Sequence, residues 1–169
     1  MLNTKVSELI NNQVNKEFYS AYLYLDFSNY YEEVGLQGFS NWYHVQAQEE
    51  MDHALMMMRY LQDNGEKVEL LAIDKPDKTF QDNISPLKAG LEHEQYVTEL
   101  IHTIYSAAYE VKDFRTMQFL DWFVKEQGEE EKNAEDLVKK MEIFGEDAKS
   151  LYMLDSELGA RQYVAPTAE

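Results

Sequence analysis

The chain has 169 residues, enough for one domain with a sizeable core, and it contains no cysteine, which excludes disulfides, thiolate metal sites and thiol nucleophiles. Its 32 acidic and 15 basic residues give a formal net charge of −17, which argues against nucleic acid or an anionic membrane as a partner and favours cations, although solubility alone would also explain it. Because the N-terminus lacks the features of a signal peptide, and no apolar run approaches the ~20 residues that cross a bilayer, we expect a soluble, cytoplasmic protein.

Helix breakers are sparse, with three prolines and seven glycines in the whole chain. The apolar periodicity predicts helices over residues 4–34, 37–64, 85–111, 114–144 and 146–161. The first four are roughly 27–30 residues long, which is longer than the usual globular helix and favours a helical bundle.

Capping signals mark several of these boundaries. Asn3 or Thr4 can cap the first helix, and Gly35 can end it. Gly65 ends the second helix in the same way. Ser85-Pro86 predicts the start of the third helix, as a cap followed by proline at the first helical position.

The connections between the helices predict the topology. Short turns after the first and third helices make antiparallel hairpins, whereas residues 66–83 lose helical periodicity. At about 3.3 Å per extended residue, a connection of some 20 residues could cover roughly 60 Å, more than the ~42 Å of a 28-residue helix. We therefore expect an all-α domain over residues 1–169, with up-down-down-up helix order and one long crossover.

Each of the four long predicted helices has a glutamate where its apolar stripe should place a core residue: Glu17, Glu50, Glu94 and Glu130. A lone buried carboxylate costs several kcal/mol unless it is paired or bound to a cation. Any single one could turn outward at a helix irregularity, but four such positions together predict a metal site.

The residue types indicate which metal this site would take. Glu50 and His53 lie three residues apart, so they share one helix face and can hold one ion, with Glu17 from the first helix. Glu94 and Glu130 would supply a second ion, and Glu50 would bridge the two. Carboxylates with one imidazole suit Fe(II) or Mn(II) better than structural zinc, and two irons can pass two electrons to one dioxygen.

Two short motifs resemble those of a known family. Residues 48–53, QEEMDH, resemble the second-helix signature of ferritins. Residues 126–131, EQGEEE, preceded by Trp122, resemble the fourth-helix signature of prokaryotic non-haem ferritins. The resemblance covers essentially the whole chain, and the matching positions on the first and third helices are Glu17, Tyr19, Tyr24, His93 and Glu94.

This resemblance implies a ferritin-like four-helix bundle with one long crossover between the second and third helices and a short C-terminal fifth helix. It also implies a ferroxidase and iron store, built as a homo-oligomeric shell of 24 subunits, that takes Fe(II) and either dioxygen or hydrogen peroxide. Carried over to this sequence, the first iron would be held by Glu17, Glu50 and His53. The second would be held by Glu50, Glu94 and Glu130, with Gln127 close by.

The resemblance implies two further roles near this centre. Glu49, Glu126 and Glu129, with Glu130 shared, match a third and weaker iron site of the prokaryotic branch, although the residues alone would also fit a solvated charge run. Tyr24 matches a tyrosine beside the two irons that could donate an electron. Its simpler interpretation is a core phenol hydrogen-bonded to Glu94, and the two roles are compatible.

One departure separates this chain from bacterioferritins, which carry a second Glu-x-x-His motif on the fourth helix. Here the corresponding pair is Gln127 and Glu130, so the second iron should lack an imidazole and be held more loosely, which favours storage over a permanent cofactor. Bacterioferritins also bind haem through a methionine on the second helix, and Met51 lies in a comparable local context. No haem is expected here, because Met51 points about 100° away from Glu50 around the helix and the second Glu-x-x-His motif is missing.

Three other classes of protein fit this sequence less well. A diiron oxygenase or peroxidase of the rubrerythrin type would need a substrate pocket or a cysteine-bearing domain, and neither is visible in this cysteine-free sequence. A DNA-protecting shell of twelve subunits would place its ligands across a dimer interface and lack the fifth helix. A plain helical scaffold would not explain why costly, unpaired glutamates are placed in the core.

Overall fold

The computed structural model describes residues 2–166, and within them every regular element is a helix. The bounds are α1 Thr4–Glu33, α2 Gln37–Asp63, α3 Ser85–Glu110, α4 Phe114–Phe144 and α5 Ala148–Leu158. The predicted all-α fold class is confirmed. Within residues 2–166, none of the helices combines the length and apolar character needed to cross a membrane.

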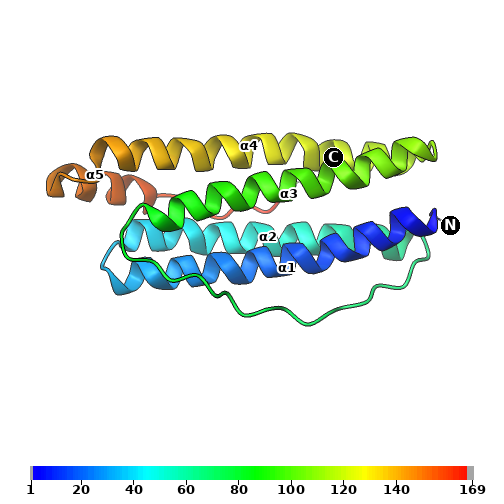
Figure 1. Ribbon diagram of the computed structural model, residues 1–169, viewed down its shortest axis with the longest axis horizontal. Helices are drawn as coiled ribbons and strands as arrows, with labels where there is room; N and C mark the ends of the chain where they lie inside the picture. Colours follow the sequence, from blue (N-terminus) through cyan, green and yellow to red (C-terminus); the bar gives the residue numbers. More distant parts are fainter. Residues whose placement is uncertain (1, 167–169) are drawn as a thin grey trace.

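Helices α1 and α2 form one antiparallel hairpin and α3 and α4 form another, and the two hairpins pack side by side (Figure 1). The crossover between α2 and α3 runs along the outside of the bundle from one end to the other (Figure 1). Asn11 and Asn15, one turn apart on α1, hold it there: the Asn11 amide donates to Glu69 O at 3.1 Å, and Leu71 N donates to Asn15 Oδ1 at 2.7 Å.

Local chemistry explains where α1 and α2 begin and end. Asn3 caps α1, accepting a hydrogen bond from Lys5 N at 3.0 Å, so Asn3 rather than Thr4 supplies the cap. Gly35 and Gly65 follow the first two helices with φ of +81° and +78°, the left-handed conformation that favours glycine.

The predicted Ser85 cap of α3 is wrong. Ser85 is the first residue of the helix, and Ile84 before it makes no side-chain capping hydrogen bond. Asp82 supplies the acceptor instead, because its Oδ1 receives the Ser85 backbone N–H at 2.9 Å. A serine ahead of proline therefore marked the start, but the capping oxygen comes from three residues earlier.

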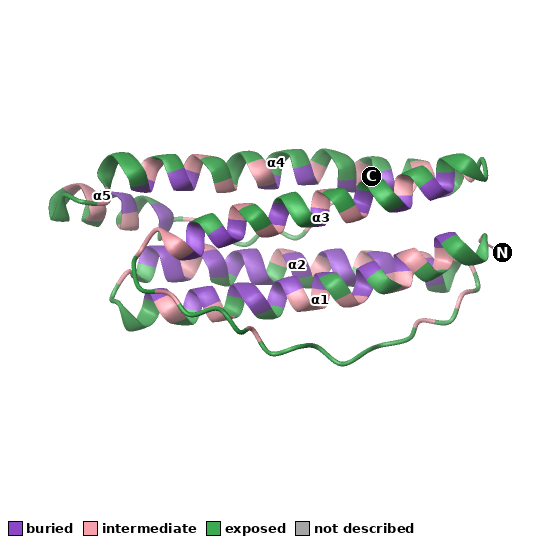
Figure 2. Ribbon diagram, viewed as in Figure 1, coloured by how far each residue is buried: buried purple, intermediate pink, exposed green. Residues whose placement is uncertain are grey.

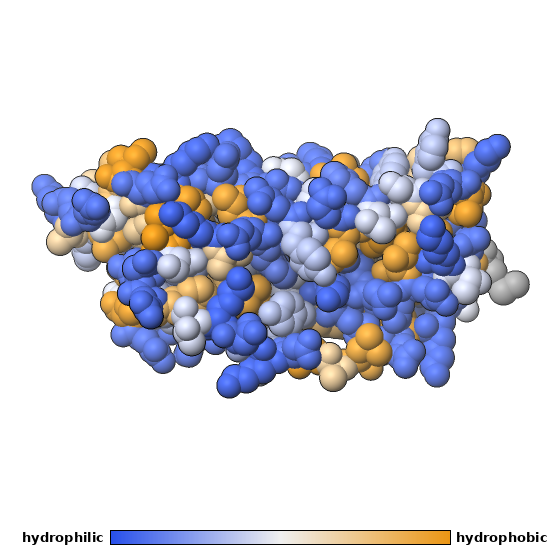
Figure 3. Space-filling view, in the orientation of Figure 1, coloured by the Kyte–Doolittle hydropathy of each residue, from blue (hydrophilic) through white to orange (hydrophobic). Residues whose placement is uncertain are grey.

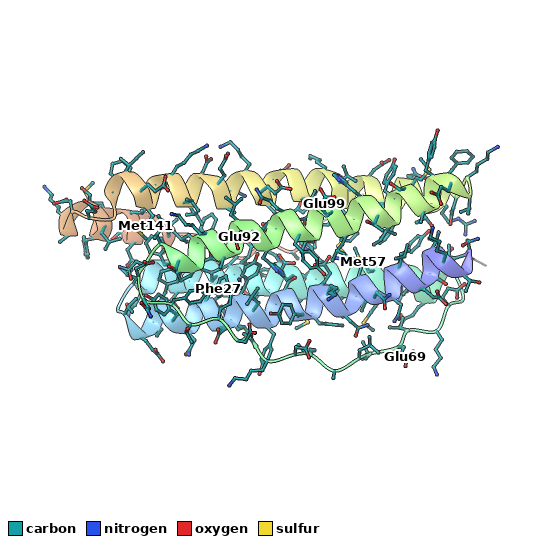
Figure 4. The ribbon with its side chains drawn as sticks, viewed as in Figure 1. Phe27, Met57, Glu69, Glu92, Glu99 and Met141 are labelled. Atoms are coloured by element: carbon teal, nitrogen blue, oxygen red, sulfur yellow. The ribbon has the colours of Figure 1, made fainter. Side chains whose placement is uncertain are left out.

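Two clusters of buried apolar side chains fill the bundle on either side of a polar band. Phe27 and Tyr43 belong to the cluster nearest α5, and Ile10 and Met57 belong to the other. Figure 4 shows Phe27 and Met57 well apart along the bundle, and Figure 2 shows buried residues following the facing sides of α1 to α4. The band between them holds the buried polar side chains described below.

Helix α5 packs across the end of the bundle and caps α2. Asp155 Oδ1 accepts the backbone N–H groups of Gly38 and Phe39 at 2.8 and 3.0 Å, two donors that the start of a helix leaves without intrahelical partners. The backbones approach so closely that a Cβ on Gly38 would lie 1.6 Å from Asp155 O. Glycine is therefore required at position 38 for this packing.

Gly38→Ala should destabilise the protein by about 1–3 kcal/mol, because α5 must move away and uncap α2. Gly128→Ala is the matched control: Gly128 lies inside α4 with nothing within 4 Å of the added Cβ, so alanine should stabilise by about 0.5–1 kcal/mol. Denaturant midpoints of the two variants measure both effects. Equal stability of Gly38→Ala and the wild type would contradict this account of the α2–α5 contact.

Candidate metal centre

Helices α1 to α4 each bring one glutamate into the polar band. Glu17, Glu50, Glu94 and Glu130 are only 1%, 2%, 3% and 6% exposed, and His53 is 2% exposed. Each glutamate lies near the middle of its helix on the stripe that faces the neighbouring helices, so the periodicity that buries apolar residues buries the carboxylates too.

The carboxylates form two adjacent groups that could each hold a cation. One group is Glu17, Glu50 and His53, and the other is Glu50, Glu94 and Glu130. Within each group the potential ligand atoms lie within 4.8 Å of one another. Because Glu50 belongs to both, the arrangement can hold two ions with a shared carboxylate between them.

One carboxylate oxygen of Glu17 lacks a hydrogen-bond partner among residues 2–166. Gln13 Nε2 donates to Glu17 Oε1 at 2.8 Å. Glu17 Oε2 is the buried side-chain oxygen for which no hydrogen-bond partner is found among residues 2–166. Buried polar atoms are nearly always partnered, and this oxygen lies beside the Glu50 carboxyl, so the two oxygens leave room for a shared proton, a water molecule or a metal ion.

Glutamine amides orient the other carboxylates. Gln46 Nε2 donates to Glu130 Oε2 at 2.6 Å and to Glu50 Oε1 at 3.2 Å, so one amide joins the two groups. Sequence reasoning missed the roles of Gln13 and Gln46. Each precedes a glutamate of its own helix by four residues, the spacing at which side chains meet on one helix face, and that signal could have found them.

The third helix glutamate is held by Tyr24 and Gln127. The buried Tyr24 hydroxyl donates to Glu94 Oε1, and Gln127 Nε2 donates to Glu94 Oε2 at 3.2 Å. Tyr24 therefore takes the simpler role expected for it, a core phenol bonded to Glu94, and it also lies directly beside the carboxylate cluster.

Burial strongly favours the protonated form of these acids. It raises the pKa of Glu17, Glu50, Glu94 and Glu130 to about 8, and a neighbouring carboxylate raises each pKa further: Glu50 acts on Glu17 and Glu94, Glu130 on Glu50, and Glu94 on Glu130. Without metal, the cluster therefore retains protons near neutral pH. Metal cations compete directly with those protons for the same oxygens.

The residues expected at a third site, Glu49, Glu126 and Glu129, differ in their exposure and in their partners. Glu126 is half-buried and forms a third possible metal group with His53 and Glu130, whose ligand atoms again lie within 4.8 Å. Glu49 instead pairs with Arg161, whose Nη2 lies 2.5 Å from Glu49 Oε2. Glu129 is exposed and pairs with Lys125 at 3.7 Å.

A four-helix bundle with one long crossover and carboxylates projecting inward from facing helices defines the ferritin-like class. The profile of the family described as Ferritin-like domain matches residues 7–144. The chain is 35% identical to a Haemophilus influenzae protein named probable bacterial non-heme ferritin-like protein, over 94% of this chain and 96% of that one. It is 37% identical to a bacterial non-heme ferritin of Campylobacter jejuni, over 92% and 93% of the two chains.

Solved structures agree with these relatives. A closed form of the Archaeoglobus fulgidus ferritin, engineered by mutagenesis, superposes with a TM-score of 0.94 at 43% identity, covering 97% of this chain and 100% of the other. The chain therefore belongs to the ferritin family. The predicted resemblance to non-haem ferritins is confirmed, and membership supports the predicted function of iron storage with ferroxidase activity.

The pKa shifts predict that the metal-free protein loses stability as pH rises. A glutamate with a pKa of about 8 in the folded chain and 4.5 in the unfolded chain stabilises the fold fully below pH 4.5 and loses that contribution as pH rises through 8. The slope is at most about 1.4 kcal/mol per pH unit for each proton.

Thermal midpoints of metal-free protein between pH 5 and 9 measure this loss. Glu17→Gln removes one of the protons concerned without changing the side-chain shape, so its midpoint should fall less steeply than that of the wild type. If the thermal midpoints of the two proteins fell in parallel with pH, the pKa of Glu17 would not be raised in the folded protein.

Proposed function

We propose that this protein oxidises Fe(II) at a pair of sites sharing Glu50 and stores the ferric product. The first site comprises Glu17, Glu50 and His53, and the second comprises Glu50, Glu94 and Glu130. The observation that carries the proposal is the pairing of these two buried ligand groups, with an unpartnered Glu17 oxygen in the first of them.

The carboxylates bind, orient and stabilise iron as the substrate. Fe(II) binding displaces the protons that burial retains on these acids, and anionic oxygen then favours the harder Fe(III) product. Two Fe(II) ions supply two electrons, which with two protons reduce dioxygen to hydrogen peroxide or hydrogen peroxide to two waters. Dioxygen and hydrogen peroxide each accept the two electrons that two Fe(II) ions supply, so we propose both as oxidants.

The second site is proposed to release its iron more readily than the first. Its ligand group contains carboxylates but no imidazole, and Gln127 donates a hydrogen bond to Glu94 instead of offering a ring nitrogen to an ion. Fewer strong donors mean weaker retention, which suits transfer to a stored mineral. The Tyr24 hydroxyl, bonded to Glu94, is proposed as an additional electron donor.

We propose Glu126 and the shared Glu130 as the centre of a third, accessory site, with Glu49 and Glu129 as further ligands. The proximity of Glu126 to His53 and Glu130 supports this assignment. For Glu129 to join, its exposed side chain must leave Lys125, an ion pair that water screens and that therefore costs little to break.

The storage compartment is proposed to be a cytoplasmic, homo-oligomeric shell of 24 copies without haem. Leu70, Leu71 and Ile73 on the crossover are 62%, 50% and 46% exposed, and a groove of about 900 Å³ runs beside them between the crossover, α1 and α3. Hydrophobic atoms are visible along this edge in Figure 3. Exposed apolar residues of this kind suit a contact between copies.

Glu50→Ala should slow rapid aerobic Fe(II) oxidation by more than about 100-fold, because both sites lose the shared ligand. His53→Ala should act in the same direction through the first site. Glu99→Ala is the matched control, since Glu99 is an exposed glutamate on α3 (Figure 4). Stopped-flow absorbance after mixing Fe(II) with air-saturated protein measures the rate, and size-exclusion mass checks assembly. Wild-type rates in assembled Glu50→Ala would refute the site.

Glu126→Ala should keep the fast oxidation phase and change the number of Fe(II) ions oxidised per dioxygen. An accessory ligand affects how electrons and ions leave the pair, not how the pair binds its first two ions. Oxygen-electrode stoichiometry measures this, with Glu135→Ala, an exposed position on α4 paired with Lys139, as control. Complete loss of the fast phase would mean that Glu126 belongs to the pair itself.

A further inference from the structure

Arg161, just beyond the end of α5, reaches back to the face of α2 that borders the proposed third site. Its Nη1 donates to Gln46 Oε1 at 2.9 Å and to Trp42 O at 3.2 Å, and its Nη2 donates to Glu49 Oε2 at 2.5 Å. The guanidinium also lies over the Trp42 ring, 4.1 Å from its centroid. One cation thus contacts side chains and backbone over two turns of α2.

The segment around Arg161 is attached along the same helix. Asn41 Nδ2 donates to Arg161 O at 3.0 Å, and the Tyr163 hydroxyl donates to Asp52 Oδ2 at 2.5 Å. Figure 1 shows the chain after α5 turning back along the bundle. Residues 164–166 then line a hollow of about 230 Å³ whose other walls are Glu49, His53, Trp122 and Glu126. The segment 159–166 therefore covers the side of the carboxylate cluster where the third site is proposed.

The Arg161–Glu49 pair is shielded from water. The two side chains are only 17% and 20% exposed, whereas Lys125 and Glu129 in the neighbouring pair are 80% and 61% exposed. A guanidinium keeps its charge at any physiological pH, and a charge-assisted hydrogen bond of this kind is stronger than an exposed ion pair. The Glu49 carboxylate is therefore already neutralised by a cation that belongs to the chain.

We propose that Arg161 competes with metal cations for Glu49 and so weakens binding of the third divalent ion. The inference rests on the proposed function, because it concerns the occupancy of the accessory site beside the pair. Arg161 acts through Glu49 and is a positioning residue. A third ion must displace the guanidinium or bind without Glu49, and in both cases its affinity is lower than the carboxylates alone would give.

Anaerobic Co(II) titration of the metal-free assembled protein, followed by calorimetry, tests this without turnover. Arg161→Gln should bind the third ion about three- to tenfold more tightly than the wild type, the range expected for releasing a partly shielded ion pair. Arg161→Lys keeps the charge but loses the forked donors and the stack on Trp42, so its third-ion affinity should lie between those of the wild type and Arg161→Gln. Arg59→Gln is the matched control, since it removes one arginine charge from an exposed pair with Asp63 elsewhere on α2.

A double variant shows whether the effect passes through Glu49. In the Glu49→Gln background, Arg161→Gln should give no further gain in third-ion affinity. An unchanged third affinity in Arg161→Gln would overturn the inference. So would an equal gain in Arg161→Lys, or a gain that persists without Glu49, since either would indicate loosened packing of the segment. Failure of the proposed function looks different: the wild type would then bind no pair of Co(II) ions per chain.

Discussion

Burial of four carboxylates beside a single basic side chain, His53, is the constraint on which the rest of this structure depends. Glu17, Glu50, Glu94 and Glu130 are nearly inaccessible to water. Their partners are glutamine amides, a tyrosine hydroxyl and one imidazole, His53, whose Nδ1 lies 3.3 Å from Glu50 Oε2. Neutral donors can orient a carboxylate, but they cannot balance its charge. Protons or metal cations must do so, and exchange between the two is the chemistry that such a cluster offers.

The length of the helices follows from the same constraint. A polar band contributes little hydrophobic stabilisation, so the apolar burial that holds the bundle together must come from the clusters on either side of it. Each of α1 to α4 therefore has to cross one apolar cluster, the band and the other cluster, which explains helices of 26 to 31 residues. Because the two hairpins leave α2 and α3 running in the same direction, the crossover must also span that length.

What the sequence predicts well is what local periodicity determines, and most of what it misses depends on distant contacts. Glu94 stands out because its neighbours at helical spacing are apolar, so its burial follows from its own helix. The four-residue spacing of Gln46 from Glu50 indicates the contact between them, but its bond to Glu130, 84 residues away, depends on how the helices pack. The capping of α2 by Asp155 and the pairing of Arg161 with Glu49 join residues more than 110 positions apart. They depend on how α5 packs, which no local pattern encodes.

The structure balances charge differently at the centre of the cluster and at its edge. At the centre, Gln46 bridges Glu50 and Glu130 with an amide, and an arginine there would neutralise both carboxylates permanently and exclude the ions. At the edge, a guanidinium already neutralises Glu49, where weaker ion binding is compatible with passage of iron onward. The Arg161 side chain contacts both regions, since it bonds the Gln46 oxygen as well as Glu49. Because Arg161 holds the Gln46 oxygen, the Gln46 N–H groups face the Glu50 and Glu130 carboxylates. The charge of Arg161 itself stays outside these buried carboxylates.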